Sequence, residues 1–291
     1  MRFSLVVATL GRDADVAALL DTLLAQGRTD FEVIIVDQND DDRLGPIEAG
    51  YAARLPLRRL RSSVRSANHA RNLGLRHARG AIVTFPDDDC LYPPGVLDRV
   101  DAAFAADAAL HVLTGPAASP AGGLGSGRWR TESGPIDLAN VWTSVIEFNI
   151  FLRRETALAL GGFDEGMGPG SPFGSAEGND LVCRAMARGL SARYNAALRI
   201  IHPDKRLSDV AVERAERYGR GLGFALRRNG APVSTQFTFL VRPLGGVVAS
   251  VLRGRMHDAG YYWMTFRGRF AGMLAPEARR PAAVAPLTEA G

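Results

Sequence analysis

The stretch AIVTFPDDDC, residues 81–90, joins an apolar run to three adjacent acids. Five largely apolar residues lead into a proline and then into Asp87, Asp88 and Asp89. Neighbouring carboxylates repel one another, and their desolvation is costly unless a positive group lies among them. The run therefore predicts a buried strand whose carboxyl end carries concentrated negative charge.

The segments around this run alternate between strand and helix patterns. Near-continuous apolar runs predict strands, and apolar residues at helical spacing predict helices. The predicted strands are 4–9, 31–37, 81–85 and, more weakly, 57–60, and the predicted helices are 16–26, 67–78 and 95–107. Continuous apolar strands that alternate with helices indicate a parallel sheet covered on both faces and joined by right-handed crossovers. The predicted fold class is therefore α/β, with a Rossmann-like, mostly parallel sheet flanked by helices.

The second half of the chain is less regular. Its predicted elements are a long surface loop at 115–135, an extended segment at 141–154, a short helix within 155–165 that ends at Gly161, a mobile loop at 166–175, a helix at 177–189, a strand at 197–203 and then two or three basic helices. These patterns divide the chain into a sheet-containing domain, residues 1–205, and a basic helical C-terminal extension, residues 206–291.

Charge is distributed unevenly along the 291 residues. The net charge is +4 at pH 7, but residues 1–204 carry −4 and residues 205–280 carry +9. Because the body is acidic and no recognised nucleic-acid-binding motif is present, nucleic acid is not an expected partner.

The composition also bears on the compartment. Cys90 and Cys183 provide neither a disulfide framework nor a zinc-site spacing, which favours a reducing, cytoplasmic compartment. The apolar N-terminus is too short for a signal peptide and reads as a first strand. No apolar run approaches the roughly 18 to 20 residues of a membrane-spanning helix, so we do not expect a spanning protein.

The basic tail interleaves arginines with aromatic residues. They are Arg227, Arg228, Arg253, Arg255, Arg267 and Arg269, with Phe224, Tyr261, Tyr262, Trp263, Phe266 and Phe270. A basic amphipathic stretch with aromatics is typical of an interfacial anchor, here at the inner face of the cytoplasmic membrane. Alternatively, these helices pack their aromatics against the body or against a second subunit in a homodimer. The sequence leaves these interpretations open.

The acidic cluster lies where such a sheet binds ligands. Ligands of parallel α/β sheets sit beyond the carboxyl ends of the strands, and Thr9, Asp37 and the three aspartates all follow strands. Carboxylates bunched there suit Mg²⁺ or Mn²⁺, with positions left for a substrate phosphate. The alternative is a helix-entry turn, because two prolines open the next helix and acids near its N-terminus favour its dipole.

Seven segments occur in an order that resembles a known enzyme family. They are VVATLGR, FEVIIVDQNDDD, SANHARNLGL, GAIVTFPDDDCLYPPGVL, LGGFDE, EGNDLVCRA and IIHPD. Over residues 1–205 they are similar to the family 2 glycosyltransferases of the GT-A fold, especially bacterial enzymes of surface and exopolysaccharide synthesis. The resemblance implies an inverting, metal-dependent transferase. Such an enzyme moves a sugar from a nucleotide-diphosphate donor, with UDP favoured, to a hydroxyl of a saccharide or lipid-linked acceptor.

The resemblance assigns roles to individual positions. Asp87 and Asp89 match a DxD motif that contacts the metal and the donor ribose, with Asp88 between them and Asp89 as the first choice of direct ligand. His202 matches a third metal ligand or a diphosphate contact. The other positions on the nucleotide side are Thr9, Arg12, Asp37 and Arg71. The residues alone leave structural alternatives for the last two, namely a turn cap for Asp37 and an ion pair with a nearby carboxylate for Arg71.

Inversion needs a base that takes the proton of the acceptor hydroxyl. The family places an acidic motif at the start of a late helix, and Glu177 and Asp180 match it on one helix face. Gly178 stands where the family's usual catalytic aspartate would be, which departs from the family pattern. We favour Glu177, at the boundary of the 166–175 loop, because Asp180 has an i,i+4 partner in Arg184. We expect that loop to close over the donor and exclude water.

Two other functions stay open on the residues alone. A sugar nucleotidyltransferase would use a similar sheet, but its glycine-rich loop should follow the first strand, where VVATLGRD contains one glycine. A non-catalytic scaffold that binds nucleotide sugars is consistent with a glycine at position 178.

Overall fold

The sheet is built from the alternating segments of the first half of the chain. The computed structural model describes residues 1–204, 208–279 and 284–290. In order, its first elements are β1 (Phe3–Thr9), α1 (Ala14–Leu24), β2 (Phe31–Asp37), α2 (Gly45–Tyr51), β3 (Leu57–Arg61), α3 (Ala67–His77), β4 (Ile82–Thr84) and α4 (Val96–Ala106). β1 lies between β2 and β4 and is parallel to both, and β3 is parallel to β2. The carboxyl ends of these strands therefore meet at one edge, as predicted.

The second half of the chain completes the sheet with shorter strands. Its elements are β5 (Leu110–Thr114), β6 (Ala117–Ala118), β7 (Gly134–Pro135), β8 (Ile150–Arg153), α5 (Arg154–Ala159), α6 (Glu177–Ala187), β9 (Ser191–Tyr194) and β10 (Ile200–Ile201). The strand order is β3-β2-β1-β4-β8-β5-β9-β7, and β8 is antiparallel to both β4 and β5. β6 and β10 form a separate parallel pair. The predicted mostly parallel α/β sheet is confirmed, with an antiparallel strand at its centre.

Two local predictions in this half were wrong. The segment 141–154 was predicted to be extended, but it begins with two 3₁₀ turns, η1 (Val141–Thr143) and η2 (Glu147–Asn149). Side chains there hold the backbone in turns, since Asn149 Nδ2 donates to two carbonyls from distant loops. The strand predicted at 197–203 is reduced to β10. The short elements α2, β5 and β9 had no counterpart in the sequence patterns.

Apolar side chains cover both faces of the sheet. On β1, Phe3, Leu5 and Val7 belong to the core beneath α1 and α4, whereas Val6 belongs to the core beneath α3, α5 and α6. α3 approaches β1 closely at Gly74, where an added Cβ would collide with Val6. Burial on both faces explains why the strands are apolar without alternation.

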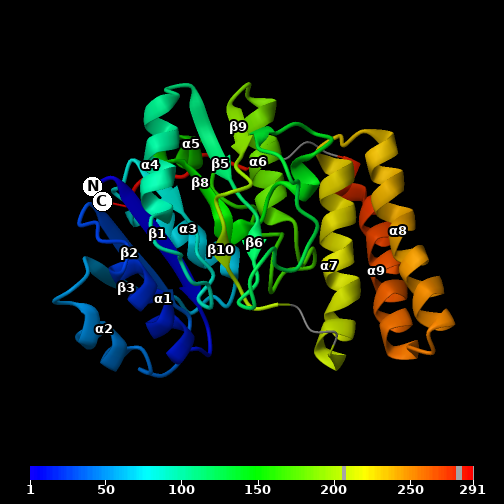
Figure 1. The fold of residues 1–291 in the computed structure, drawn as a ribbon, viewed down its shortest axis with the longest axis horizontal. Helices are drawn as coiled ribbons and strands as arrows, with labels where there is room; N and C mark the ends of the chain where they lie inside the picture. Colours follow the sequence, from blue (N-terminus) through cyan, green and yellow to red (C-terminus); the bar gives the residue numbers. More distant parts are fainter. Residues whose placement is uncertain (205–207, 280–283, 291) are drawn as a thin grey trace.

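The C-terminal extension forms a helical layer beside the sheet. Its described elements are α7 (Asp209–Arg228), α8 (Val233–Leu252), α9 (Met256–Leu274) and the 3₁₀ turn η3 (Pro276–Arg279). Figure 1 shows α7 nearest the body and α8 outermost. α7 joins the body through the stacked rings of Phe173 and Phe224, whose centroids lie 3.8 Å apart. The helical extension is as predicted, but the domain boundary at 205/206 lies outside the described residues and stays a prediction.

α8 departs from the prediction that no segment could span a membrane. It is 20 residues long, and its mean hydropathy of 1.3 makes it long and apolar enough to cross a bilayer by length and composition. Polar residues and one arginine, Arg242, interrupt its apolar run without lowering the mean enough to exclude it. Only 11% of its most apolar window is buried, so it is not the core helix of this fold.

Candidate active site

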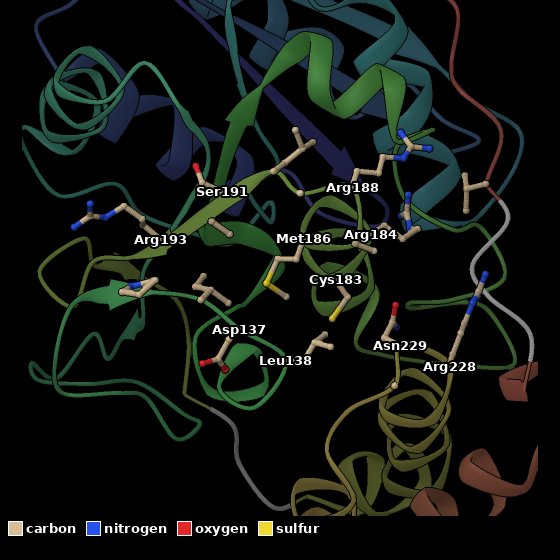
Figure 2. A pocket seen from close by; sticks show the side chains of 18 of the residues that line it. Asp137, Leu138, Cys183, Arg184, Met186, Arg188, Ser191, Arg193, Arg228 and Asn229 are labelled. Carbon is tan, nitrogen blue, oxygen red and sulfur yellow. The ribbon is translucent and has the colours of Figure 1, made fainter.

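One large cavity lies away from the predicted site residues. It has a volume of 1040 Å³ and lies between α6, β9 and the end of α7. Figure 2 shows Asp137, Leu138, Cys183 and Met186 around it. Burial raises the pKa of the Cys183 thiol well above its ordinary value, so the thiol is protonated. None of the predicted site residues is among the described residues that line this cavity.

A smaller pocket of 530 Å³ lies at the carboxyl ends of β1, β2 and β4. The predicted residues that line it are Arg12, Arg71, Asp87, Asp88, Asp89, Glu177 and His202. We assign the candidate active site to this pocket despite its smaller volume, because it collects acids, arginines and a histidine where parallel sheets bind ligands.

Asp87, Asp89 and His202 form one cluster in this pocket. One potential ligand atom from each lies within 4.8 Å of the others. His202 Nε2 lies 3.4 Å from Asp89 Oδ1, while its Nδ1 lies 2.8 Å from the Pro203 carbonyl oxygen. A carbonyl can only accept, so Nδ1 donates and Nε2 presents a lone pair toward the aspartates in the neutral ring. The ring of Phe148 stacks on His202 at 4.7 Å and fixes its plane.

These residues fit a divalent cation. Asp89 Oδ1 is buried and has no hydrogen-bond partner among the described residues. An unpartnered buried carboxylate oxygen is costly, and a cation coordinated there would satisfy it. Two carboxylates and a neutral imidazole are ligands that Mn²⁺ and Mg²⁺ accept.

Asp88 points away from this cluster and anchors the first strand. Its Oδ2 accepts a hydrogen bond from Thr9 Oγ1 at 2.6 Å, and its Oδ1 accepts one from Arg12. Arg12 also pairs with Asp89 Oδ2 at 2.7 Å. Burial raises the pKa of Asp88, and the contacts with Thr9 and Arg12 oppose that rise. The three aspartates thus divide into two that form the cluster with His202 and one that also lines the pocket but is held by Thr9 and Arg12.

Arg71 links the acidic cluster to α6. Its guanidinium is 5% exposed, donates to Asp87 Oδ1 at 2.8 Å and donates to Glu177 Oε1 at 3.2 Å. Burial, reinforced by the nearby charge of Glu147, raises the pKa of Glu177 from its ordinary value near 4.5 to about 8, although Arg71 opposes this. Glu177 is therefore largely protonated at neutral pH. The ion pair that the sequence left open for Arg71 is present.

Asp180 is held away from the pocket. It is completely buried, and its carboxylate accepts hydrogen bonds from Arg184 Nε at 2.8 Å and from Asn229 Nδ2 at 3.0 Å. Arg184 in turn donates to the carbonyls of Leu160 and Gly162. Asp180 therefore makes the intrahelical pair that was weighed as the alternative to a catalytic role, and it ties α6 to the loop after α5.

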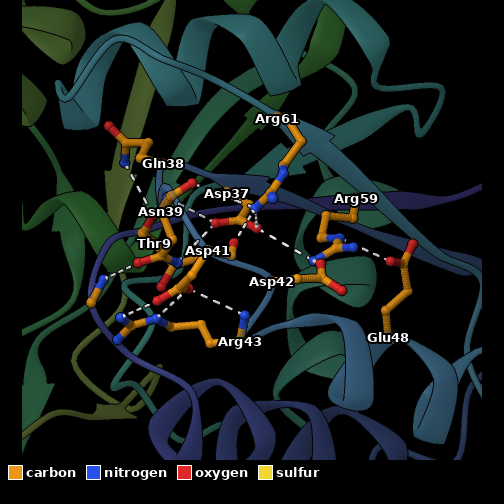
Figure 3. A network of polar contacts seen from close by, with 11 residues as sticks. Thr9, Asp37, Gln38, Asn39, Asp41, Asp42, Arg43, Glu48, Arg59 and Arg61 are labelled. Carbon is orange, nitrogen blue, oxygen red and sulfur yellow. Dashed lines mark hydrogen bonds and ion pairs between the residues drawn. The ribbon is translucent and has the colours of Figure 1, made fainter.

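Asp37 lies in an ion-pair network behind the pocket (Figure 3). Its Oδ2 accepts from Arg61 at 2.6 Å, and its Oδ1 accepts from the backbone and side-chain amides of Asn39 at 2.9 and 2.8 Å. Asp37 and Thr9 are not among the described residues that line the pocket. The capping role that the sequence left open for Asp37 is present, and its contact with the nucleotide stays a prediction.

Several pocket residues were not anticipated from the sequence. They are Gln38, Arg65, Glu147 and Phe148 from the body, and Arg214 and Tyr218 from α7. The basic character of the tail was the one signal for Arg214, but no pattern showed that α7 reaches the pocket. Pro169, Gly170, Gly174 and Ser175 of the predicted mobile loop also line the pocket, so this loop borders the site as expected.

Solved structures with this architecture place the fold in a class. TarS 1–349 of Staphylococcus aureus in complex with UDP-GlcNAc aligns with a TM-score of 0.61 and 16% identity over 92% of each chain. The mannosyltransferase PcManGT of Pyrobaculum calidifontis, in complex with GDP-Man and Mn²⁺, aligns with a TM-score of 0.66 and 16% identity over 95% of this chain and 88% of that one. The fold is that of the GT-A glycosyltransferases, as the motifs predicted.

The sequence comparisons identify the family. The model of glycosyl transferase family 2 matches residues 4–155, slightly more than half of the chain, and the chain belongs to this family. An uncharacterized glycosyltransferase of Haemophilus influenzae is 35% identical over 98 residues, which cover 33% of this chain and 32% of that protein. The poly(ribitol-phosphate) beta-N-acetylglucosaminyltransferase TarS of S. aureus is 32% identical over 93 residues, 31% of this chain and 16% of that protein. The matched region is thus a third or less of the length of these relatives, and the family model ends at residue 155, before α6.

Proposed function

We propose that this chain is a metal-dependent, inverting glycosyltransferase. It transfers a sugar from a nucleotide-diphosphate donor, with UDP favoured, to a hydroxyl of a saccharide or lipid-linked acceptor in surface polysaccharide or glycolipid synthesis. The observation that carries the proposal is a single pocket that combines the Asp87–Asp89–His202 cluster with four arginines, Arg12, Arg65, Arg71 and Arg214. TarS binds UDP-GlcNAc and PcManGT binds GDP-Man on the same fold, which supports a nucleotide-sugar donor.

The arginines suit a diphosphate that gains charge as it leaves. Arg12 and Arg71 are held against the acidic cluster by the ion pairs described above, so they require little reorganisation when charge develops. Arg214 has no ion pair with any described residue and is exposed at the pocket wall, so its guanidinium is available to a phosphate. Asp87, Asp89 and His202 would hold Mn²⁺ or Mg²⁺, which supplies positive charge beside the leaving group when bound.

The loop after α5 and the first turns of α7 would shield the donor from water. Gly168 and Gly170 adopt positive φ angles of 84° and 92° in this loop, and the Ser175 hydroxyl donates to the Tyr218 carbonyl at 2.7 Å. The loop is therefore tied to α7 at one end and bends at glycines near the other. Its closure over a bound donor would limit hydrolysis.

Calorimetric titration tests this proposal directly. UDP, GDP and TDP are titrated into the full chain with Mn²⁺ and then with EDTA, on wild type and Asp89→Ala. We expect one nucleotide to bind in a metal-dependent way, and the variant to lose at least tenfold in affinity. If no nucleotide binds under any condition, the cluster is a structural turn and the proposal fails.

We also propose that the outer face of α8 and α9 contacts an anionic lipid surface, which places the protein at the inner face of the cytoplasmic membrane. We define this face by the exposed large apolar side chains of the two helices, which are Val233, Phe237, Val248, Val251, Leu252, Met256, Trp263, Phe270 and Leu274. Leu252 is 82% exposed and adjoins Arg253 and Arg255 at the turn between the helices.

Charge favours lipid over a second copy of the chain as the occupant of this face. Residues 233–274 contain five arginines and one aspartate, so two such faces would repel each other, whereas anionic headgroups attract them. Flotation of the full chain with phosphatidylglycerol and phosphatidylcholine vesicles tests this. We expect binding to the anionic vesicles only, weakened by salt and lost in Leu252→Ser/Met256→Ser but kept in the control Leu124→Ser on the body. Absence of flotation together with a dimer in light scattering would assign the face to a second copy.

A further inference from the structure

We propose that Glu147 is the general base of the transfer reaction, which rests on the proposed function. Glu147 begins the turn η2 and lines the pocket beside the acidic cluster. Its neighbour Phe148 stacks on His202, so η2 is placed directly against the cluster. Nothing in the sequence patterns singled this residue out.

The position of Glu147 is set by the first turn of α6. Its Oε1 accepts a hydrogen bond from the backbone N–H of Gly178 at 3.2 Å. A Cβ added to Gly178 would lie 3.1 Å from both Cγ and Oε1 of Glu147, and 3.0 Å from Ile150 Cδ1. The Glu147 side chain therefore occupies the space that a side chain at position 178 would enter. The carboxylate that the family resemblance leads one to expect on α6 is supplied here from η2.

The two pocket glutamates differ in their availability to a substrate. The Glu177 side chain is 4% exposed, is bound by the Arg71 guanidinium and packs under Gly168 of the loop. Burial raises its pKa, which disfavours the ionised form that a general base needs at neutral pH. Glu147 is partly exposed, and the one hydrogen bond that its side chain accepts from a described residue, from the backbone N–H of Gly178, involves Oε1 and leaves Oε2 available to a substrate. Glu147 interacts electrostatically with three charged or titratable groups, namely Arg71, Glu177 and Tyr218.

The reaction at Glu147 balances as a single displacement. The acceptor oxygen forms a bond to the anomeric carbon while the bond from that carbon to the diphosphate oxygen breaks. The electron pair of the broken bond stays on the diphosphate, and the hydroxyl proton passes to the Glu147 carboxylate and then to solvent. The net products are the glycoside, the nucleoside diphosphate and one proton. With water as acceptor, the same step releases the free sugar.

Relocation of the carboxylate tests this assignment. Nucleotide release from UDP-GlcNAc and from GDP-mannose is measured with Mn²⁺ and water as acceptor, and UDP and GDP binding are measured by calorimetry on the same variants. Glu147→Gln keeps a hydrogen-bond acceptor for Gly178, so we expect its affinity for the nucleotide to stay within about twofold. Its turnover should fall by about a hundredfold or more, the usual size of a general-base contribution.

The double variant Glu147→Ala/Gly178→Asp distinguishes a base from a space-filling side chain. Removal of the Glu147 side chain makes room for the carboxylate introduced by Gly178→Asp in the same volume, and we expect at least a tenfold recovery of turnover over Glu147→Ala. The matched control Glu147→Ala/Gly178→Ala restores side-chain volume but no carboxylate, so it should not recover. Thermal unfolding of each variant confirms that it is folded.

Several outcomes would overturn the assignment. Turnover that survives in Glu147→Gln but is lost in Glu177→Gln with nucleotide binding intact would make Glu177 the base. Equal recovery in both double variants would reduce Glu147 to a packing role. A wild type that binds nucleotide yet releases none from either donor, even in long incubations, would also overturn it, because loop closure slows hydrolysis but a working base should still activate water at a measurable rate. If the wild type binds no nucleotide, the proposed function itself is refuted, which is a different outcome from refuting the role of Glu147.

Discussion

Replacement of Arg71 by methionine tests how much the buried guanidinium contributes to the stability of the fold. Methionine keeps the apolar stem but removes a guanidinium that is 5% exposed. That group stacks over the ring of Phe163 at 5.3 Å, a desolvated cation–π contact worth about 1–2 kcal/mol. It also donates to Asn68 Oδ1 at 3.0 Å and to Glu177, and each acceptor left unsatisfied costs about 1 kcal/mol.

The remaining ion pair adds less to this total. The Asp87 side chain is 33% exposed, so solvent screens its pairing with Arg71 and the loss is at most about 1 kcal/mol. Glu177 is largely protonated, so removal of Arg71 leaves no buried charge uncompensated at that position. The expected loss in the free energy of unfolding is therefore about 3 kcal/mol at pH 7, a typical value for a disrupted buried polar network.

Urea denaturation followed by circular dichroism, in EDTA to remove bound metal, measures this loss. The control Arg71→Lys keeps the positive charge and the apolar stem but lacks the planar, multiply donating guanidinium. Its loss in the free energy of unfolding should therefore be about half as large. A loss below about 1 kcal/mol would refute the packing and hydrogen-bond argument. A loss well above 5 kcal/mol would show that Glu177 is ionised in the native state, since an unpaired buried charge alone costs about 3–5 kcal/mol.

Local geometry supports three further predictions. The pKa of Glu177 is raised from near 4.5 to about 8, so its contribution to stability is complete below pH 4.5 and is lost as pH rises through 8. The free energy of unfolding of the wild type should therefore fall between pH 5 and 8 more steeply than that of Glu177→Gln, by up to about 1 kcal/mol per pH unit. Urea titrations at several pH values measure both slopes, and equal slopes would contradict the raised pKa. Gly268→Ala should lose about 1–3 kcal/mol, because its Cβ would collide with the Glu216 carbonyl of α7. The matched control Gly260→Ala has open space around its Cβ and should be neutral or slightly stabilising, and equal effects of the two in thermal unfolding would refute the close helix contact. Asp37→Asn should lose about 1–3 kcal/mol, because it removes the charge of a completely buried carboxylate that accepts from Arg61 and lies beside Arg59, and a change below about 0.5 kcal/mol would show that solvent already screens that network.

Much of the catalytic edge could be predicted because it depends on local patterns. The runs at 4–9, 31–37 and 81–85 are near-continuous apolar runs, which are typical of strands buried on both faces. Parallel strands end at one edge, so the residues after them had to lie close together. The grouping of Asp87 and Asp89 at this edge followed from these patterns, whereas the family resemblance was needed to place Arg12 and Arg71 beside it.

The contacts that assign chemical roles depend on residues far apart in the chain. Glu177 meets Arg71 across 106 positions, and Glu147 reaches the backbone of Gly178 across 31. The sequence could flag the glycine at 178 as a departure from the family pattern, but it could not show which carboxylate fills the space beside it. That outcome depends on the 3₁₀ turn at η2, which the apolar pattern of 141–154 concealed.

The sequence by itself determined the α/β class, the acidic edge of the sheet and the basic helical tail, because each follows from periodicity or composition within one segment. Only the tertiary structure decided that Asp88 binds Thr9 and Arg12 while its two neighbours form a cluster with His202. It also decided that α7 brings Arg214 and Tyr218 to the site and that α8 remains exposed. The physical reason is that side-chain direction and helix docking are set by packing between distant segments, which no local pattern encodes.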